Sequence, residues 1–514
     1  MRKRTAKPCM KGKAMLEKFH ESIDKRVFYI GGIVCLFFVL FTCAAPERAE
    51  AIFSWLLSVF CSDFGWFYLL SVVFFIVFCI YMAFSRYGKI KLGKDDDKPE
   101  HSTFSWFFML FAAGMGIGLV FWSVAEPMSH YITPPYGEGS TVDSAVLAMQ
   151  YTFMHWGIHP WACYVIVGLP LAYYQFRKGA PALLSSCIAP IVGEKAAKGV
   201  LGSIIDVMAV FATVFGVATS LGLGAMQINS GLFYVFNIPY CTSVLFGIIA
   251  VATALFITSS CTGIDKGIKM LSDTNMVIMA ILLCFVFFSG SMLFVMNFMV
   301  ESFGAYISNL ISCSFWTDSF GESNGWLNGW TIFYWAWWIS WGPFVGGFIA
   351  RISKGRTIRE FVIGSMFVPM ILSVVFMTIL GGNAIWFDMN GVSEIAQAMD
   401  ENISYALFAL LEQFPIPKVT SLIATFLICI FFITSADSST FVCAMMTAKG
   451  SQNPPNALKI FWGVSEGVIA AVLLFVGGLT ALQSAAILSA LPMIFVCFLM
   501  AAALVKSLKS EIKE

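Results

Sequence analysis

The chain alternates long apolar runs with short polar segments. A run of about 20 apolar residues is long enough to cross the hydrocarbon core of a bilayer, and twelve such runs occur. We expect membrane spans at 27–45, 64–85, 104–124, 143–175, 200–225, 242–260, 275–297, 326–350, 361–382, 418–446, 457–478 and 482–505. An even number of spans predicts that both termini lie on one side of the membrane.

The positive charges select that side. With these spans, all of the 31 lysines and arginines except Arg48 and Lys418 fall on one face. Because basic residues stay in cytoplasmic segments, that face is predicted to be cytoplasmic. The basic N-terminal tail 1–26 and the short C-terminal tail 506–514 are therefore both expected in the cytoplasm.

Two spans are interrupted near their middles, the third by Gly114-Met115-Gly116-Ile117-Gly118 and the eighth by Gly342-Pro343. Spans three to seven (104–297) and eight to twelve (326–505) then form two sets of five with opposite topology, each opening with a broken helix. This pattern is typical of an inverted-repeat transporter with its binding site near the midplane.

The remaining segments lie outside the repeats. Two peripheral spans occupy 27–103, and an external segment, 298–325, connects the repeats and contains an expected interfacial helix at 300–313. We place Glu126 and Glu138 among the acidic residues of the outer loops.

Composition supports this membrane architecture. Hydrophobic residues make up 59% of the chain and charged residues only 12%, against about 25% charged in soluble domains. We therefore expect an all-α polytopic membrane protein. The 14 cysteines include no CxxC pair and are interpreted as small buried hydrophobes. No phosphate-binding loop or catalytic motif is present, so neither an ATP-driven pump nor an enzyme is expected, and nothing indicates nucleic-acid binding.

The segment 330–344 holds five of the 15 tryptophans. At 100° per residue, Tyr334, Trp337, Trp338, Trp341 and Phe344 share one helix face. Such a face serves either helix packing or the binding of a quaternary ammonium cation, which is held through ring quadrupoles.

A second aromatic set lies on another span. Trp156, Trp161 and Tyr164 share one side of the helix if Pro160 bends it only mildly. Two aromatic sets, each beside a break, favour a cation site over simple packing.

Other residues fit a hard cation. Unwinding at the glycines would free the carbonyls of Ala112 and Met115 to bind an ion, whereas close packing between Gly114 and Gly118 is the alternative. Thr434 and Ser435 offer hydroxyl oxygens inside an apolar span, or they bond back to their own helix, as does Thr213.

Two histidines, His155 and His159, lie within the second aromatic set. No neighbouring cluster of Cys, Asp or Glu completes a metal site in the sequence. We expect both imidazoles to serve packing or hydrogen bonding.

Several motifs resemble the betaine/choline/carnitine transporters. They are FAAGMGIGLVFWSVAEP (111–127), MHWGIHPWACY (154–164), ATVFGVATSLGLGA (212–225), WTIFYWAWWISWGPFVGGFIARISKGRTIREF (330–361) and FFITSADSS (431–439). The resemblance covers about residues 27–505. It implies two inverted repeats of the LeuT type and transport of small quaternary ammonium compounds by alternating access.

The resemblance also implies roles for individual residues. Trp156, Trp161, Tyr164 and Trp338 would form a trimethylammonium box, with Trp337 and Trp341 along the pathway. A substrate carboxylate would approach the backbone amides of the glycine segment, which comprises Gly114, Met115, Gly116, Ile117 and Gly118.

Two sodium sites are implied in the same way. The first consists of Ala112, Met115, Phe431, Thr434 and Ser435, and the second of Thr213 and Phe344. The second site departs from the family pattern, because the hydroxyl expected four residues after Thr213 is replaced by Val217, which offers no oxygen.

We expect Na⁺ symport of glycine betaine, since Gly118 stands where choline-specific relatives often carry Asp and since the GMGIG pattern of sodium-coupled members is retained. The alternatives are a choline or carnitine/butyrobetaine transporter, proton-coupled or exchanging, and a substrate sensor without transport. Na⁺ is the expected coupling ion and no organic cofactor is expected. The expected setting is the cell membrane of a prokaryote, with the lipid bilayer and a homotrimer as partners.

Overall fold

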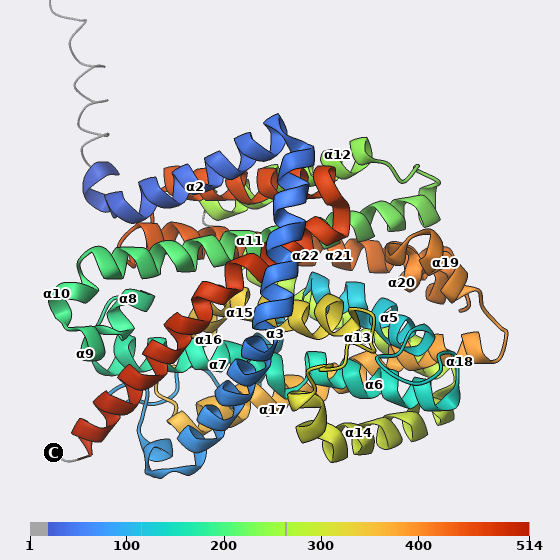
Figure 1. Ribbon diagram of the computed structural model, residues 1–514, viewed down its shortest axis with the longest axis horizontal. Coiled ribbons are helices and arrows are strands. Elements are labelled where there is room, and N and C mark those ends of the chain that lie inside the picture. Colours follow the sequence, from blue (N-terminus) through green and yellow to red (C-terminus); the bar gives the residue numbers. More distant parts are fainter. Residues whose placement is uncertain (1–18, 115, 263–264, 513–514) are drawn as a thin grey trace, which may run out of the picture.

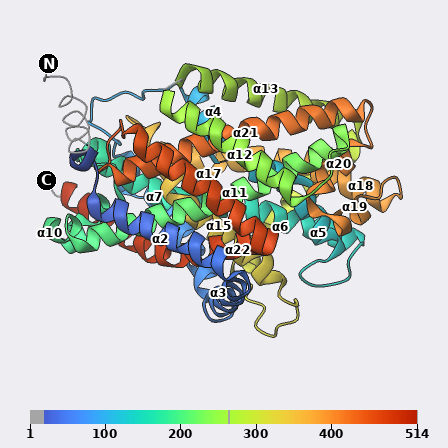
Figure 2. The same ribbon diagram turned by 90° about the horizontal axis from the view of Figure 1, so that it is seen from above.

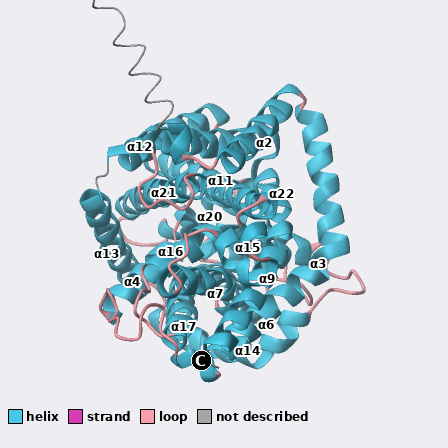
Figure 3. Ribbon diagram, turned by 90° about the vertical axis from the view of Figure 1, so that its left-hand side faces the viewer, coloured by secondary structure: helices cyan, strands magenta, loops and turns pink. Residues whose placement is uncertain are grey.

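A computed structural model of the protein describes residues 19–114, 116–262 and 265–512. These residues are almost entirely helical, and they form no strand apart from one isolated bridge between Lys91 and Thr357. Figure 3 shows helices packed on helices throughout. The prediction of an all-α fold is confirmed.

The helices are named in chain order in Figure 1. The α-helices are α2 (Lys25–Ala44), α3 (Pro46–Phe84), α4 (Thr103–Gly114), α5 (Ile117–Ile132), α6 (Val142–Trp156), α7 (Ile158–Ala172), α8 (Leu184–Cys187), α9 (Ala189–Val192), α10 (Glu194–Ala197), α11 (Val200–Phe236), α12 (Thr242–Thr262), α13 (Asp265–Ser289), α14 (Met292–Phe315), α15 (Phe333–Trp341), α16 (Gly347–Arg351), α17 (Ile358–Met377), α18 (Asn383–Met389), α19 (Ile395–Glu401), α20 (Ala406–Leu411), α21 (Pro417–Thr447) and α22 (Asn456–Glu511). Short 3-10 or π-helical turns are η1 (Arg86–Lys89), η2 (Tyr173–Arg177), η3 (Asn328–Ile332), η4 (Gly342–Gly346), η5 (Thr378–Gly382) and η6 (Ile403–Tyr405).

Within the described residues, 8 helices are long and apolar enough to cross a membrane. They coincide with all but three of the predicted spans, and α22 holds the last two, on either side of the non-helical Gly477 and Gly478. The three exceptions, 104–124, 143–175 and 326–350, are helical but interrupted. These are the spans that carry the glycine and aromatic motifs.

The interruptions differ in kind. At the glycine segment, α4 ends at Gly114 and α5 begins at Ile117, with Gly116 in a non-helical conformation. Between α6 and α7 the helix stops at Gly157 rather than bending at Pro160. The interruption expected at Gly342-Pro343 is present, since α15 ends at Trp341, but the chain continues there as the π-helical turn η4 and does not unwind. A wider turn accommodates a proline, which has no N–H to donate.

Two predicted boundaries are also wrong. The second span is part of α3, which begins at Pro46 directly after α2 and not near residue 64. The predicted interfacial helix at 300–313 is the later part of α14, which starts at Met292, so the seventh span ends at Ser289 and not at residue 297. Gly290 and Ser291 separate the two helices, and long apolar runs hide such a short break.

The segments predicted to be cytoplasmic contact one another. Leu92 pairs with Gly355 and Arg356 through backbone hydrogen bonds of 2.8 Å. Arg177 donates to the Gly93 carbonyl over 2.8 Å and forms an ion pair with Glu511 near the end of α22. The start of α2 and the end of α22 lie at the same end of the molecule (Figure 2). The side of the membrane that this end faces stays a prediction.

The tryptophan-rich helix α15 lies at the centre of the protein. It packs against α7, α11 and α22, and all nine residues from Phe333 to Trp341 are buried. Figure 3 shows α7 and α15 enclosed by α2, α3, α12, α13, α14 and α17. The core therefore surrounds the segment on which both aromatic sets converge. The exact extents of the two repeats stay predictions.

Candidate functional site

Four aromatic side chains from three helices meet beside α15. Trp156 ends α6, Trp161 and Tyr164 lie on α7, and Trp338 lies on α15. The ring centroids are 5.0 Å apart for Trp156 and Trp338, 6.2 Å for Tyr164 and Trp338, and 5.5 Å for Trp161 and Tyr164. Each pair is close to perpendicular, and all four side chains are buried. We call these four residues the aromatic box.

Hydrogen bonds fix two of the box indoles. Trp338 Nε1 donates to the carbonyl of His155 over 3.0 Å, and Trp156 Nε1 donates to Glu126 Oε2 over 2.6 Å. The indole N–H of Trp161 and the hydroxyl of Tyr164 are buried and have no partner among the described residues. A buried donor without a partner costs free energy. A ligand with an acceptor oxygen would remove that cost by bonding to these two groups.

The glycine segment lies directly against the tryptophans. A Cβ atom on Gly114 would stand 2.4 Å from Cη2 of Trp161, and one on Gly118 would stand 2.5 Å from Cη2 of Trp337. The absence of side chains lets the α4–α5 backbone approach the rings. Met115 lies outside the described residues, whereas Ala112 belongs to the last turns of α4.

The predicted pathway residues continue from the box along α15. Trp337 stacks on Trp338 at 4.7 Å and contacts Trp341 at 6.1 Å. Trp341 contacts Phe344 at 5.7 Å and donates through Nε1 to the Gly216 carbonyl of α11 over 2.9 Å. These side chains form one unbroken aromatic row with the box.

The residues predicted to bind sodium are brought together only in part. A Cβ atom on Gly116 would lie 3.2 Å from Ser435 Oγ, so the glycine segment faces α21 at that serine. Thr434 donates its hydroxyl proton to the Ile430 carbonyl over 2.9 Å, and Phe431 belongs to the same uninterrupted helix. Back-bonding therefore occurs at Thr434, although its oxygen retains lone pairs for an ion.

The second predicted ion site has fewer oxygen ligands. Thr213 donates to the Ala209 carbonyl over 2.8 Å, and Val217 is buried one turn further along α11. Phe344 is buried in η4. Val217 itself offers no oxygen, so the site lacks the second hydroxyl of the family pattern.

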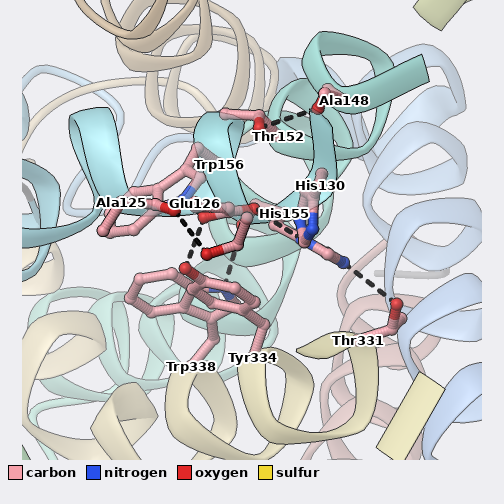
Figure 4. A network of polar contacts seen from close by, with 11 residues as sticks. Ala125, Glu126, His130, Ala148, Thr152, His155, Trp156, Thr331, Tyr334 and Trp338 are labelled. Atoms are coloured by element: carbon pink, nitrogen blue, oxygen red, sulfur yellow. Dashed lines mark hydrogen bonds and ion pairs between the residues drawn. The ribbon is translucent and has the colours of Figure 1, made fainter. Parts of the chain in front are cut away.

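Glu126 is the main residue that the sequence analysis misplaced. It is not in an outer loop but fully buried in α5, where it joins both aromatic sets. Oε2 accepts from Trp156 Nε1 and from the Tyr334 hydroxyl, while Oε1 lies 2.7 Å from His155 Nδ1 and 3.3 Å from His130 Nε2 (Figure 4). The acid thus links α5, α6 and α15. An apolar stretch on both sides of Glu126 and a histidine four residues later were the available signals.

The two histidines of the aromatic motif behave differently. His159 is a packing residue, as expected, since it stacks on Trp335 at 4.8 Å and bonds Ser314 Oγ at 2.8 Å. His155 also makes the expected hydrogen bonds, to Glu126 and Thr331, but the expectation that no acid lies close enough to complete a metal site is wrong. Glu126, His130 and His155 each direct one potential metal-ligand atom into a space where all three atoms lie within 4.8 Å of one another.

Comparisons with known proteins agree with this architecture. The betaine/carnitine/choline family transporter profile matches residues 26–513. The chain is 49% identical to the glycine betaine transporter OpuD of Bacillus subtilis, covering 95% of each protein. It is 44% identical to a probable glycine betaine transporter of Desulfitobacterium hafniense, over 95% of this chain and 99% of the relative. It is also 42% identical to an ectoine/hydroxyectoine transporter of Virgibacillus pantothenticus, over 96% and 98%.

These matches extend across both aromatic sets, the glycine segment and every predicted span. The relatives named above are transporters, which confirms that the protein is a multi-span membrane transporter and not an enzyme. The chain belongs to the betaine/carnitine/choline family of transporters.

Proposed function

We propose that the protein imports glycine betaine, or a closely related methylammonium zwitterion, by Na⁺ symport with alternating access. The aromatic box carries this proposal. Three tryptophans and a tyrosine are buried and meet edge to face in three pairs, so that they offer ring faces to a cation that has no hydrogen to donate. The similarity to a glycine betaine transporter and to a probable glycine betaine transporter supports the same substrate.

The charge of the site favours a zwitterion over choline. Gly118 supplies no carboxylate, and both oxygens of Glu126 are engaged by Trp156, Tyr334 and the two imidazoles. A ligand with its own carboxylate needs no such counter-charge. The unpaired Trp161 N–H and Tyr164 hydroxyl, together with the amides of the glycine segment, are suitable donors to that carboxylate.

Sodium is the proposed coupling ion at a site formed by Ala112, Met115, Phe431, Thr434 and Ser435. The proximity of Gly116 to Ser435 supports it, since α5 and α21 approach each other at this serine. An ion held between the two helices would favour one conformation of the transporter over the other. The second site, at Thr213 and Phe344, is the weaker part of the proposal because of Val217.

Uptake into proteoliposomes tests the proposal. Purified protein is reconstituted, and uptake of labelled glycine betaine is followed while the Na⁺ and proton gradients are varied independently. We expect an inward Na⁺ gradient to drive accumulation and a proton gradient alone to be ineffective. Equal uptake with and without the Na⁺ gradient would contradict the coupling.

Competition between labelled glycine betaine and unlabelled compounds identifies the preferred substrate. Unlabelled glycine betaine, choline, carnitine and ectoine are each added in excess. Glycine betaine should displace the label at the lowest concentration, and stronger competition by choline or carnitine would contradict the assignment. Binding without any uptake would instead indicate a sensor.

A further inference from the structure

The cluster formed by Glu126, His130 and His155, which we call the carboxylate–histidine triad, has the composition of a metal site. Glu126 Oε1 lies 2.7 Å from His155 Nδ1 and 3.3 Å from His130 Nε2, and all three side chains are fully buried. Figure 4 shows the two imidazoles approaching the same side of the carboxyl group. The proposed transport mechanism assigns no role to this convergence.

The donor set selects a class of ion. Two imidazole nitrogens and one carboxylate oxygen suit borderline transition metals such as Zn²⁺, whereas Ca²⁺ and Mg²⁺ require more oxygen ligands and Cu(I) prefers sulfur. Zinc bonds of about 2.0–2.2 Å place tetrahedral ligand atoms roughly 3.3 Å apart. The triad already meets that spacing at Glu126 and His130, and its largest separation stays within 4.8 Å. Because Glu126 Oε1 and His155 Nδ1 are only 2.7 Å apart, binding of the ion requires these two atoms to separate by about 0.6 Å.

The surroundings are arranged as they are around protein metal ligands. His155 Nε2 bonds Thr331 Oγ1 at 3.0 Å, which leaves Nδ1 to face the triad. Glu126 Oε2 is held by Trp156 and Tyr334, which leaves Oε1 for the ion. His130 Nδ1 is buried and has no partner among the described residues. Outer hydrogen bonds orient metal ligands, and they are present at His155 and Glu126 but not at His130.

We propose that the carboxylate–histidine triad binds one Zn²⁺-type ion per chain and that this ion inhibits transport. The ion would join His130 and Glu126 of α5 to His155 of α6, one residue from Trp156 of the box. Three protein ligands leave a fourth position for solvent. Trp326 and Trp330 cover His130, with ring centroids at 4.7 and 4.5 Å. Entry of the ion requires these indoles to move, and its binding then fastens helices that must rearrange during transport.

Direct binding is measured on the purified full-length protein in detergent, which makes the result independent of substrate and coupling ion. Co²⁺ serves as a spectroscopic probe and Zn²⁺ as the competitor. We expect one Co²⁺ per chain, visible d–d bands typical of tetrahedral nitrogen and oxygen ligation, and loss of the bands on adding Zn²⁺. The absence of these bands, or an intense sulfur-to-cobalt charge-transfer band from a cysteine site, would overturn the proposal.

Variants assign the binding to the triad. His130→Ala should weaken Co²⁺ binding about 10-fold or more, and His130→Asn, which keeps a polar side chain, decides the point if the alanine variant does not fold. His159→Ala is the matched control, because this buried histidine packs on Trp335 outside the triad. Equal affinity in the wild type and both His130 variants would overturn the proposal.

Inhibition is then tested by uptake. Micromolar Zn²⁺ should reduce uptake of labelled glycine betaine by the wild type, and a chelator should restore it. The concentration for half-inhibition should rise about 10-fold or more in the His130 variant that folds and stay unchanged in His159→Ala. Undiminished uptake with the site occupied would overturn the inhibitory role.

Discussion

The indole rings of Trp156 and Trp338 meet at a centroid distance of 5.0 Å, with their planes 74° apart. One ring comes from the end of α6 and the other from the middle of α15, so both helices are needed to form this corner between the two rings. The N–H of each indole is bonded away from the shared space, to Glu126 and to the His155 carbonyl. The corner therefore presents carbon faces rather than polar edges.

Trp338→Leu should abolish most of the substrate affinity. A desolvated cation–π contact contributes about 2 kcal/mol or more, equivalent to about 30-fold in the dissociation constant. The matched control is Trp335→Leu on the same helix, whose indole stacks on His159 and not on the box. Binding of labelled glycine betaine to both purified variants is the measurement. Equal affinities in the two variants would contradict the role of Trp338.

Glu126→Gln should weaken substrate binding about 10- to 100-fold, because hydrogen bonds to a charged group contribute about 1.5–3 kcal/mol. The amide has one neutral accepting oxygen in place of two charged ones, so the hydrogen bonds from Trp156 and Tyr334 weaken and the group facing the two imidazoles can no longer accept. Intrinsic tryptophan fluorescence upon titration with glycine betaine measures the effect. Glu138→Gln, an exposed acid in the following loop, is the control.

Tyr334→Phe tests whether this network acts as a unit. Its hydroxyl donates to the same Glu126 oxygen as Trp156, so the effects of Glu126→Gln and Tyr334→Phe should be less than additive in a double-mutant cycle. Full additivity would show that the two side chains act separately.

Gly118→Ala should impair transport through steric conflict. The new methyl group would stand 2.5 Å from Trp337 Cη2, and overpacking a rigid site costs about 1–3 kcal/mol. Gly247→Ala in α12 is the control, since nothing lies within 4 Å of its Cβ position. Uptake and thermal unfolding are measured together, and a variant that stays stable but transports normally would contradict the close fit.

Thr434→Val should raise the Na⁺ concentration for half-maximal uptake about 10-fold, which corresponds to about 1.4 kcal/mol of ion binding. Thr425→Val is closely matched, because Thr425 is also a back-bonded threonine of α21, at 2.8 Å from the Ser421 carbonyl, but is not among the predicted ion ligands. Glycine betaine uptake at graded Na⁺ concentrations separates the two. An equal shift in both variants would assign the effect to helix stability.

The general fold followed from patterns that are local in the sequence. The apolar runs predicted the helices, and the 100° spacing placed Trp337, Trp338 and Trp341 in one row, because both signals depend only on near neighbours. Breaks were harder to place. A helix stops at Gly157 where a bend at Pro160 was expected, and at Gly342-Pro343 the α-helix gives way to a π-helical turn and not to unwound chain. Backbone geometry at such points depends on the helices packed against them.

Glu126 shows what sequence alone could not supply. Apart from His130, four residues on, its partners lie 29, 30 and 208 positions away, at His155, Trp156 and Tyr334. Spacing along the chain contains no information about such pairs. Glu126 lies near the end of a predicted span and was therefore assigned to a solvated loop. In the structure it is buried, and its hydrogen bonds connect the two aromatic sets.

The hydrogen bond between Trp156 and Glu126 also changes the indole electronically. An acidic side chain that accepts the N–H proton polarises the bond and leaves more electron density on the ring, as hydrogen bonds polarise their neighbours in a medium of low dielectric. The ring face that attracts a cation then becomes more negative. In the proposed site, Glu126 would thus strengthen the hold on a positive ligand from behind the ring without placing a further charge in front of it.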